Sequence, residues 1–241
     1  MSRFRLETVP AGAPGTGGAG GIVHLVMDDP DRAANVLDGP ALAELEAALA
    51  GLEVRPGLRG VVVRSGKPGS FVTGADLEAL GPAADRDAVR EAILRAQGIL
   101  ARLAALPCPT VAAIEGACLG GGAELALACG SRVAAEEPHT RIGLPEILLG
   151  GIPAFGGTAR LPRLVGTAAA LDLVLTGRLL DGREAERVGL VARAVPAVLL
   201  LEHAHRRLAE LAAAAARARG GPGAARDRWR PRSPGAWLAD G

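Results

Sequence analysis

The fold is decided by residues 109–133, which read PTVAAIEGACLGGGAELALACGSRV. Thr110–Ile114 is a short apolar run that predicts a buried strand. The glycines at 120–122 lead into a predicted helix near residues 123–129, and residues 132–135 predict the next strand. Strand, turn, helix and strand in this order indicate a layered α/β fold, because each helix can bury its apolar face against a sheet.

The same signals continue toward the N-terminus. Residues 61–63 are all valine, which favours strands, and Ile22–Met27 is another strand candidate. Asp38 is a candidate helix N-cap, and Pro40 suits the first turn of that helix. A longer helix is expected over residues 85–106. The first of these two helices would bury leucines at helical spacing, namely Leu42, Leu45, Leu49 and Leu52.

The repeated strand–turn–helix stretches predict one layered unit rather than two domains. Farther along the chain, Asp181 and Glu184 form a capping-box pattern that predicts the start of another helix. The last residues are rich in Gly, Pro and Arg, a composition typical of disorder. The expected organisation is a core over residues 1–196, a C-terminal helix over residues 197–219 and a disordered tail over residues 220–241.

Charge and cysteine content exclude several function classes. The net charge of +1 gives no global attraction to nucleic acid. The 3 cysteines, an odd number without a CxxC pair, argue against a disulfide scaffold and against a zinc site. The N-terminus lacks the apolar stretch of a signal peptide, and no apolar run is long enough to span a bilayer. We therefore expect a cytoplasmic protein with no metal, no nucleic-acid partner and no membrane.

Two glycine-containing turns are candidate anion-binding sites. Residues 116–122 precede a helix whose first N–H groups have no partner within the helix and attract negative charge. The alternative is that these glycines only allow close packing of strand and helix; a dinucleotide fingerprint fails because Leu125 stands at its third glycine. In Gly74-Ala75-Asp76, the N–H of Ala75 is a candidate second donor, whereas the alternative is that Asp76 simply caps a helix.

Two glutamates are candidate acid–base groups. Glu124 follows the glycines just inside the predicted helix, and Glu146 lies in the apolar segment GLPEILLG. If its neighbours bury Glu146, its pKa should rise so that it holds a proton near neutral pH. The alternatives are a favourable charge at a helix start for Glu124 and an ordinary surface acid for Glu146.

These stretches together resemble the crotonase (enoyl-CoA hydratase/isomerase) family. The likeness spans residues 22–196 and is most similar to the hydratase part of the multifunctional fatty-acid-oxidation α subunit. The resemblance implies an α/β fold, a spiral of ββα units that forms two sheets, followed by C-terminal helices that are shortened here. Besides residues 109–133, the matching segments are SGKPGSFVTGADLEAL (65–80), RIGLPEILLGGIP (141–153), GGTARLPRLVG (156–166) and LTGRLLDGREAERVGLVARAVP (175–196).

The resemblance also implies a reaction and its residues. Backbone N–H groups of Ala75 and Gly121 would form an oxyanion hole for the thioester oxygen. Glu124 would deprotonate water, and Glu146 would protonate the α-carbon of a 2-enoyl-CoA, giving 3-hydroxyacyl-CoA in fatty-acid β-oxidation. No cofactor would be needed, because CoA is part of the substrate. The residues expected to contact substrate or CoA are Arg32, Ala34, Thr73, Gly74, Asp76, Leu77, Gly120, Pro145 and Ala154.

The resemblance further implies a homo-trimer or hexamer and separate dehydrogenase or thiolase partners. Three departures from the family pattern stand out. Glu78 replaces a frequent lysine, and Ala154 replaces a glycine near the site. The C-terminus is short, which weakens the expectation of a trimer and of a cover over the acyl pocket.

Other functions stay open at this stage. An enoyl-CoA isomerase of the same family commonly works with one of the two acids, so the presence of both Glu124 and Glu146 favours hydration. A non-catalytic or truncated acyl-CoA-binding member is a second alternative. RNA binding through the arginine-rich tail is a third, against which stands the lack of any basic surplus in the rest of the chain.

Overall fold

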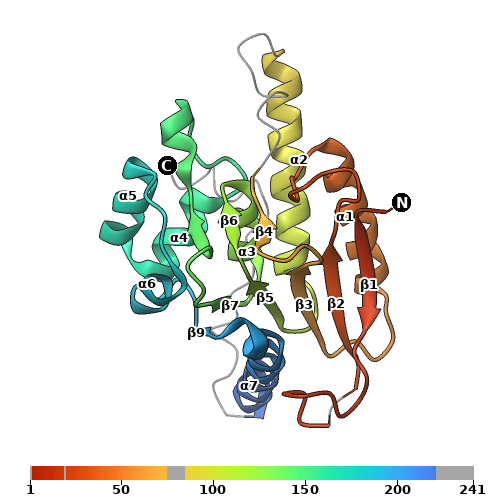
Figure 1. The fold of residues 1–241 in the computed structure, drawn as a ribbon. Coiled ribbons are helices and arrows are strands. Elements are labelled where there is room, and N and C mark those ends of the chain that lie inside the picture. Colours follow the sequence, from red (N-terminus) through yellow and green to blue (C-terminus); the bar gives the residue numbers. More distant parts are fainter. Residues whose placement is uncertain (1, 19, 75–84, 221–241) are drawn as a thin grey trace.

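A computed structural model describes residues 2–18, 20–74 and 85–220, whose strands form two sheets (Figure 1). The 6-stranded sheet has the order β1-β2-β3-β5-β7-β9. Its first two strands pair antiparallel and the others are parallel. The strands span β1 Phe4–Thr8, β2 Ile22–Met27, β3 Gly60–Ser65, β5 Thr110–Ile114, β7 Ser131–Ala135 and β9 Arg193–Val195.

A second, 3-stranded parallel sheet is built from the segments that follow three strands of the first. Strand β4 (Ser70–Val72) follows β3, β6 (Ala117–Leu119) follows β5, and β8 (Arg141–Gly143) follows β7. Helix α2 (Arg86–Ala104) comes after β4, and helix α3 (Gly121–Ala128) comes after β6. Each turn of the chain therefore adds one strand to each sheet and then a helix, which confirms the expected spiral of ββα units.

The N-terminal helices begin where their capping signals predict. Helix α1 (Gly39–Glu53) starts after Asp38, whose side chain accepts a hydrogen bond from the N–H of Ala41 at 2.8 Å. The four leucines predicted to be buried are buried, because they recur on one face of the helix. Helix α2 is capped by Asp85 and buries Ile99, Leu100 and Leu103 against the rest of the core.

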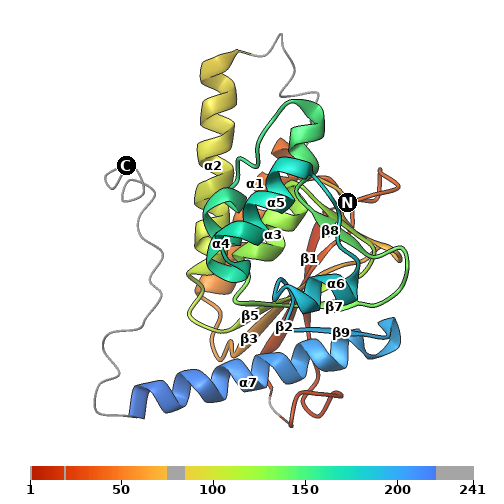
Figure 2. The ribbon, with the colours of Figure 1, turned by 90° about the vertical axis from the view of Figure 1, so that its left-hand side faces the viewer.

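Alternating strand residues divide the core into two clusters on opposite faces of the large sheet. Val61 and Val63 of β3 belong to the main cluster with α1, α2 and α3, whereas Val62 belongs to a smaller cluster. Helix α7 (Leu200–Gly220) covers this smaller cluster with Leu200, Ala204 and Leu208. Figure 2 shows α7 lying across the sheet on the side away from α1, α2 and α3.

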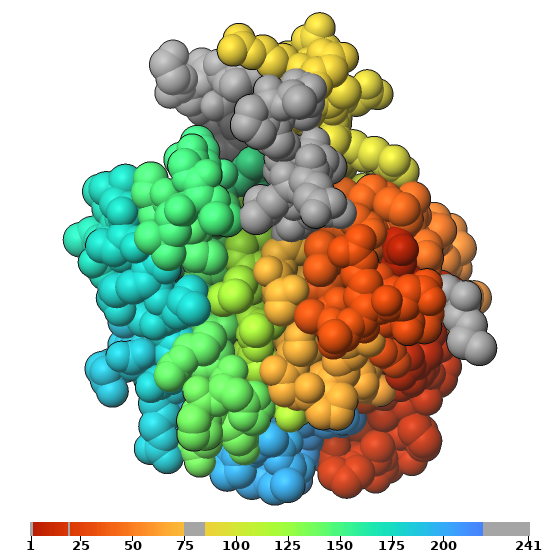
Figure 3. Space-filling view, turned by 45° about the horizontal axis from the view of Figure 1, so that its top comes forward, coloured from red at the N-terminus to blue at the C-terminus, as the bar shows by residue number. Residues whose placement is uncertain are grey.

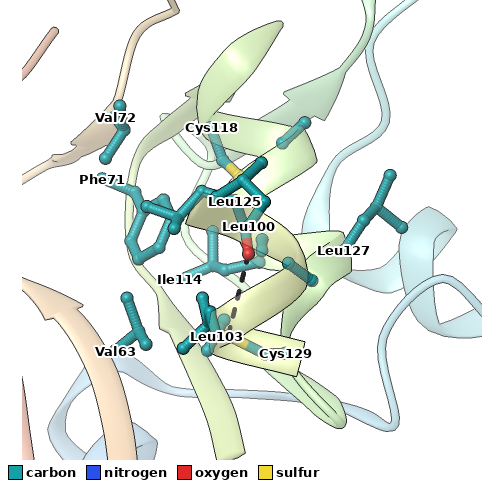
Figure 4. Packing of buried hydrophobic residues seen from close by; sticks show 14 of the residues in the cluster. Val63, Phe71, Val72, Leu100, Leu103, Ile114, Cys118, Leu125, Leu127 and Cys129 are labelled. Atoms are coloured by element: carbon teal, nitrogen blue, oxygen red, sulfur yellow. Dashed lines mark hydrogen bonds between the residues drawn. The ribbon is translucent and has the colours of Figure 1, made fainter. Parts of the chain in front are cut away.

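The main cluster joins both sheets to the helix that follows the glycines. Figure 4 shows Phe71 and Val72 of β4, Ile114 of β5 and Leu125 of α3 converging there. The thiol of Cys129 donates to the carbonyl oxygen of Leu125 at 3.7 Å, and Cys118 is buried nearby. The cysteines are free, Cys118 and Cys129 buried and Cys108 half-buried. Helix α3 is therefore fixed within the core on all sides, since every one of its residues is buried.

The C-terminal part adds short helices beside the second sheet. Helix α6 (Gly182–Arg187) has the predicted capping box between Asp181 and Glu184. The stretch expected as a C-terminal helix contains η3 and α7, and residues 221–241 lie outside the described part of the chain. None of the helices in the described ranges combines the length and the apolar character needed to cross a membrane. The remaining elements are η2 Pro145–Leu149, α4 Gly157–Val165, α5 Thr167–Thr176 and η3 Ala197–Leu199.

Candidate active site

Three predicted site segments meet at the start of α3. A Cβ atom added to Gly120 would lie 3.3 Å from Oε1 of Glu146 and 3.8 Å from Cα of Gly74. Gly120 has φ 51°, a conformation that favours glycine, and its N–H donates to the carbonyl oxygen of Gly143 at 2.9 Å. In Figure 3 a yellow-green strip of surface lies between orange segments before residue 75 and green segments after residue 140. The two glycine-containing turns and the carboxyl group of Glu146 therefore lie next to one another and form a single candidate site.

The Thr73–Gly74 turn is held by a residue that sequence analysis missed. The carbonyl oxygen of Asn35 accepts hydrogen bonds from the N–H of Thr73 at 2.9 Å and its hydroxyl at 3.1 Å. The buried Asn35 amide donates to carbonyl oxygens of β2 and β4, on Met27 and Phe71. The N–H of Leu37 donates to the carbonyl oxygen of Gly74 at 2.9 Å. The sequence signal for Asn35 was the RAANVL segment at residues 32–37, from which the sequence analysis selected only Arg32 and Ala34 as substrate contacts.

Gly121 is the first residue of α3, so its N–H has no acceptor one turn earlier within the helix. The next residue shows why glycine is required here. A Cβ atom on Gly122 would overlap the carbonyl oxygen of Val72 and lie 2.7 Å from the Val72 Cβ atom. Strand β4 and helix α3 are therefore in direct backbone contact. Tight packing and an anion-binding helix start, which the sequence presented as alternatives, are compatible in the same turn.

Glu124 lies in the first turn of α3, and its residue is only 2% exposed. Its Oε1 atom accepts two backbone hydrogen bonds of 2.7 Å, from the N–H groups of Phe155 and Gly157. Burial and the nearby Glu146 raise its pKa to about 7, against the lowering effects of the two N–H groups and of Arg160. A carboxyl group with this pKa can accept or release a proton at neutral pH.

Glu146 is the second residue of the 3-10 helix η2, directly after Pro145. Its Oε2 atom is buried and has no hydrogen-bond partner among the described residues. Burial raises the pKa of this carboxyl group, and its own backbone N–H opposes the shift. The arrangement matches the buried alternative for Glu146 rather than the surface acid.

The loop opposite Glu124 is held by two more residues that sequence analysis missed. The side-chain amide of Gln97 in α2 donates to the carbonyl oxygen of Ala154 at 2.8 Å. The guanidinium of Arg160 in α4 donates to the carbonyl oxygen of Phe155 at 2.9 Å. Gly156 has φ 110°, a conformation strained for other residues. Gln97 carried no local signal, whereas Arg160 belongs to the GGTARLPRLVG segment.

The remaining predicted contacts are placed unevenly. Arg32 is exposed and pairs with Asp38 at 3.3 Å. Ala34 is half-buried beside Asn35, and Ala154 packs against the main core cluster. Ala75, Asp76 and Leu77 lie outside the described residues. Within the ranges the structure describes, no group of three or more His, Cys, Asp or Glu residues could hold a metal ion.

The arrangement supports acid–base chemistry on a substrate that develops negative charge. Two carboxyl groups with raised pKa values flank a helix start whose N–H groups can stabilise an anionic oxygen. Because Oε1 of Glu124 is already occupied by two backbone donors, its Oε2 atom is the one available for proton transfer.

Comparisons with known proteins agree on one family. A family model described as enoyl-CoA hydratase/isomerase matches residues 17–219. The fatty acid oxidation complex subunit alpha of Shewanella loihica is 46% identical over 187 residues, which are 76% of this chain and 26% of that protein. The chain thus spans about a quarter of the length of this curated relative.

Solved structures with a similar fold were also found. The crystal structure of an enoyl-CoA hydratase from Bacillus anthracis superposes with a TM-score of 0.76 at 34% identity, covering 90% of this chain and 81% of that one. The structure of Pseudomonas aeruginosa DspI superposes with a TM-score of 0.75 at 29% identity, with the same coverage of 90% and 81%.

Proposed function

The chain belongs to the enoyl-CoA hydratase/isomerase family, and we propose that it adds water to a 2-enoyl-CoA thioester to give the 3-hydroxyacyl-CoA. The observation that carries this proposal is the pair Glu124 and Glu146, both with raised pKa values and both beside the start of α3. Hydration needs one group to take a proton from water and another to deliver a proton to the α-carbon. Two such carboxyl groups meet that need.

In the proposed mechanism, Glu124 is the base. Oε1 stays bound to the Phe155 and Gly157 amides, which fixes the side chain while Oε2 orients a water molecule toward the β-carbon. As the water attacks, its proton passes to Oε2 and electron density moves onto the thioester oxygen. Glu146 then delivers its proton to the α-carbon, which restores the thioester carbonyl.

The developing oxyanion would be stabilised by the N–H of Gly121 and, by resemblance, by that of Ala75, which lies outside the described residues. One such donor typically lowers the barrier by ~2.7–4 kcal/mol. The thioester itself accepts the electron density, so the proposed reaction uses no cofactor beyond the CoA of its substrate. The CoA arm would lie along Thr73–Gly74, with Arg32 toward its phosphates.

The proposal extends to assembly and context. Solved relatives named enoyl-CoA hydratases and the curated α subunit support an acyl-CoA substrate in fatty-acid oxidation. A homo-trimer or hexamer, and separate chains for the dehydrogenase and thiolase steps, remain proposals from the same likeness. The oligomeric state is tested by measuring the mass of the purified protein by analytical ultracentrifugation.

The deciding experiment mixes the purified protein with crotonyl-CoA and follows loss of the conjugated enoyl-thioester absorbance. Mass spectrometry in ¹⁸O-labelled water identifies the product. We expect one labelled oxygen at C3, with turnover lost in Glu124→Gln and in Glu146→Gln but kept in Glu91→Gln, which changes an exposed glutamate of α2. Double-bond migration without label would instead establish isomerisation, and binding without turnover would establish a binding module.

A further inference from the structure

The loop formed by residues 154–157 binds Glu124 of helix α3, and side chains from two other helices hold the loop in place. Gln97 reaches it from α2 and Arg160 from α4, and each donates to one of its carbonyl oxygens. Its N–H groups at Phe155 and Gly157 converge on a single oxygen of Glu124. Four hydrogen bonds with side chains of three helices therefore fall on three of these four residues.

The bonds of Gln97 and Glu124 act on the same peptide unit. The carbonyl oxygen of Ala154 and the N–H of Phe155 belong to one planar trans peptide group, so they point in opposite directions. Gln97 binds the oxygen edge at 2.8 Å and Glu124 binds the N–H edge at 2.7 Å. Rotation of this peptide plane would break both bonds together. Gln97 therefore sets the direction in which the Phe155 N–H points.

Arg160 acts on the following peptide and also carries charge. It binds the carbonyl oxygen of Phe155 at 2.9 Å, and a Cβ atom added to Gly156 would lie 3.2 Å from the Arg160 Cζ atom. The guanidinium thus lies against the loop at Phe155 and Gly156. It is half-buried, and its positive charge favours the ionised form of Glu124, in opposition to burial and to Glu146.

We propose that Gln97 and Arg160 are positioning residues for Glu124: Gln97 orients the peptide that binds Oε1, and Arg160 fixes the next peptide and adds a positive charge beside the loop. Neither residue needs to touch substrate. Their kinetic effect rests on the proposed hydratase function, whereas their effect on Glu124 itself does not.

Four variants separate the two roles. Gln97→Met removes the amide with little change in length, Arg160→Met removes hydrogen bond and charge, and Arg160→Lys keeps the charge. Arg187→Met is the control, since Arg187 is an exposed arginine of helix α6. Three quantities are measured for each variant: the titration midpoint of Glu124 by ¹³C NMR of its side-chain carboxyl, hydrogen exchange of the Phe155 amide, and kcat and KM with crotonyl-CoA.

We expect faster Phe155 exchange in Gln97→Met and Arg160→Met, and a kcat about 10- to 100-fold lower with little change in KM, because a small misplacement of a catalytic group has effects of this size. The Glu124 midpoint should rise in Arg160→Met, and rise less in Arg160→Lys, which keeps the charge, and in Gln97→Met, where the Phe155 N–H that favours the ionised form is held less firmly. Arg187→Met should match the wild type in all three measurements.

Unchanged Phe155 exchange and an unchanged Glu124 midpoint in Gln97→Met and Arg160→Met would overturn the proposal. So would a loss of activity that only follows a loss of folded protein in thermal unfolding. If the wild type does not turn over crotonyl-CoA but exchange and titration change as expected, the hydratase proposal fails and the positioning proposal stands.

Discussion

The Nε2 atoms of His24 and His205 lie 2.8 Å apart and join strand β2 to helix α7 within the protein. Arg64 donates through Nε to Nδ1 of His24 at 3.1 Å, so Nδ1 accepts and the proton of His24 is on Nε2. His24 then donates to His205, whose Nδ1 is left to donate to the carbonyl oxygen of Pro14 at 2.8 Å. The bonding pattern requires both imidazoles to be neutral.

This neutral pair predicts a loss of stability in acid. Burial is the main cause that lowers the pKa of His24 from 6.5 to about 4, and the nearby His205 and the charge of Arg64 lower it further. Between these values the unfolded chain binds the proton that the folded chain does not, so the contribution of His24 is complete above pH 6.5 and falls toward pH 4. We expect the difference in unfolding free energy between wild type and His24→Leu to shrink by about 2 kcal/mol from pH 6.5 to pH 5 in urea titrations.

Exposed His139 provides the control, since His139→Gln removes an imidazole that faces solvent. Its unfolding free energy is measured against that of the wild type over the same pH range. If the difference in unfolding free energy from the wild type depended equally on pH in both variants, the His24–His205 pair would not be the cause of the loss of stability in acid.

Glu124 predicts the opposite slope over the same range. Its pKa is raised from 4.5 to about 7, mainly by burial, so the folded chain holds a proton that the unfolded chain releases. The ionised form therefore destabilises the fold above pH 7, and this cost disappears as the pH falls toward 4.5. We expect Glu124→Gln to be more stable than the wild type at pH 8, and its advantage to shrink by roughly 2–3 kcal/mol by pH 5. An advantage independent of pH would contradict the raised pKa.

The same group predicts the pH dependence of the proposed reaction. Glu124 must be ionised to accept a proton from water, and its pKa is about 7. We expect kcat/KM for crotonyl-CoA hydration to rise about tenfold per pH unit below that value, to stop rising above it, and to fall again where Glu146 loses the proton that it must deliver, because kcat/KM reports ionisations of the free enzyme. In Arg160→Met the rising limb should move to higher pH. A rate that is flat from pH 5 to pH 8 would exclude Glu124 as the base.

Features with a local chemical cause were predictable from the sequence. The Asp38 cap, the Asp181–Glu184 capping box and the valines of β3 each depend on residues within a few positions of one another. The triple glycine likewise located the contact between α3 and β4. Strand β1 was not predicted, since its short FRLET segment becomes a strand only by pairing with β2.

Contacts between site residues that are far apart in the sequence could not be predicted from local sequence patterns. Gln97 meets Ala154 across 57 positions of sequence and binds a carbonyl oxygen, a group that every residue carries. Asn35 similarly acts on Thr73 through backbone atoms 38 positions away. Helix α4 was missed as an element, because it contains Pro162 and begins with Gly157, both poor helix formers. The sequence pattern selected Glu124 and Glu146 and the resemblance gave them roles, but the burial that raises their pKa values follows only from the fold.

Two glycine substitutions should have opposite effects on stability, because one glycine touches backbone and the other does not. In Gly122→Ala the new methyl group would overlap the carbonyl oxygen of Val72, so β4 and α3 must separate. We expect a loss of roughly 1–3 kcal/mol in unfolding free energy. Gly98 lies inside α2 with no atom within 4 Å of an added Cβ, so Gly98→Ala should stabilise the protein by ~0.5–1 kcal/mol through helix propensity.

Urea unfolding of the two variants at one pH tests this contrast in stability. Their turnover of crotonyl-CoA provides a second test. Separation of α3 from β4 also moves the Gly121 N–H and Glu124, so Gly122→Ala should lose turnover even at temperatures where it is fully folded. Gly98→Ala lies one residue from Gln97 on the same helix, and because it adds to α2 without displacing a neighbour, its kcat should stay at the wild-type value. A folded Gly122→Ala with wild-type turnover would mean that the close contact between β4 and α3 is not needed to place the catalytic groups.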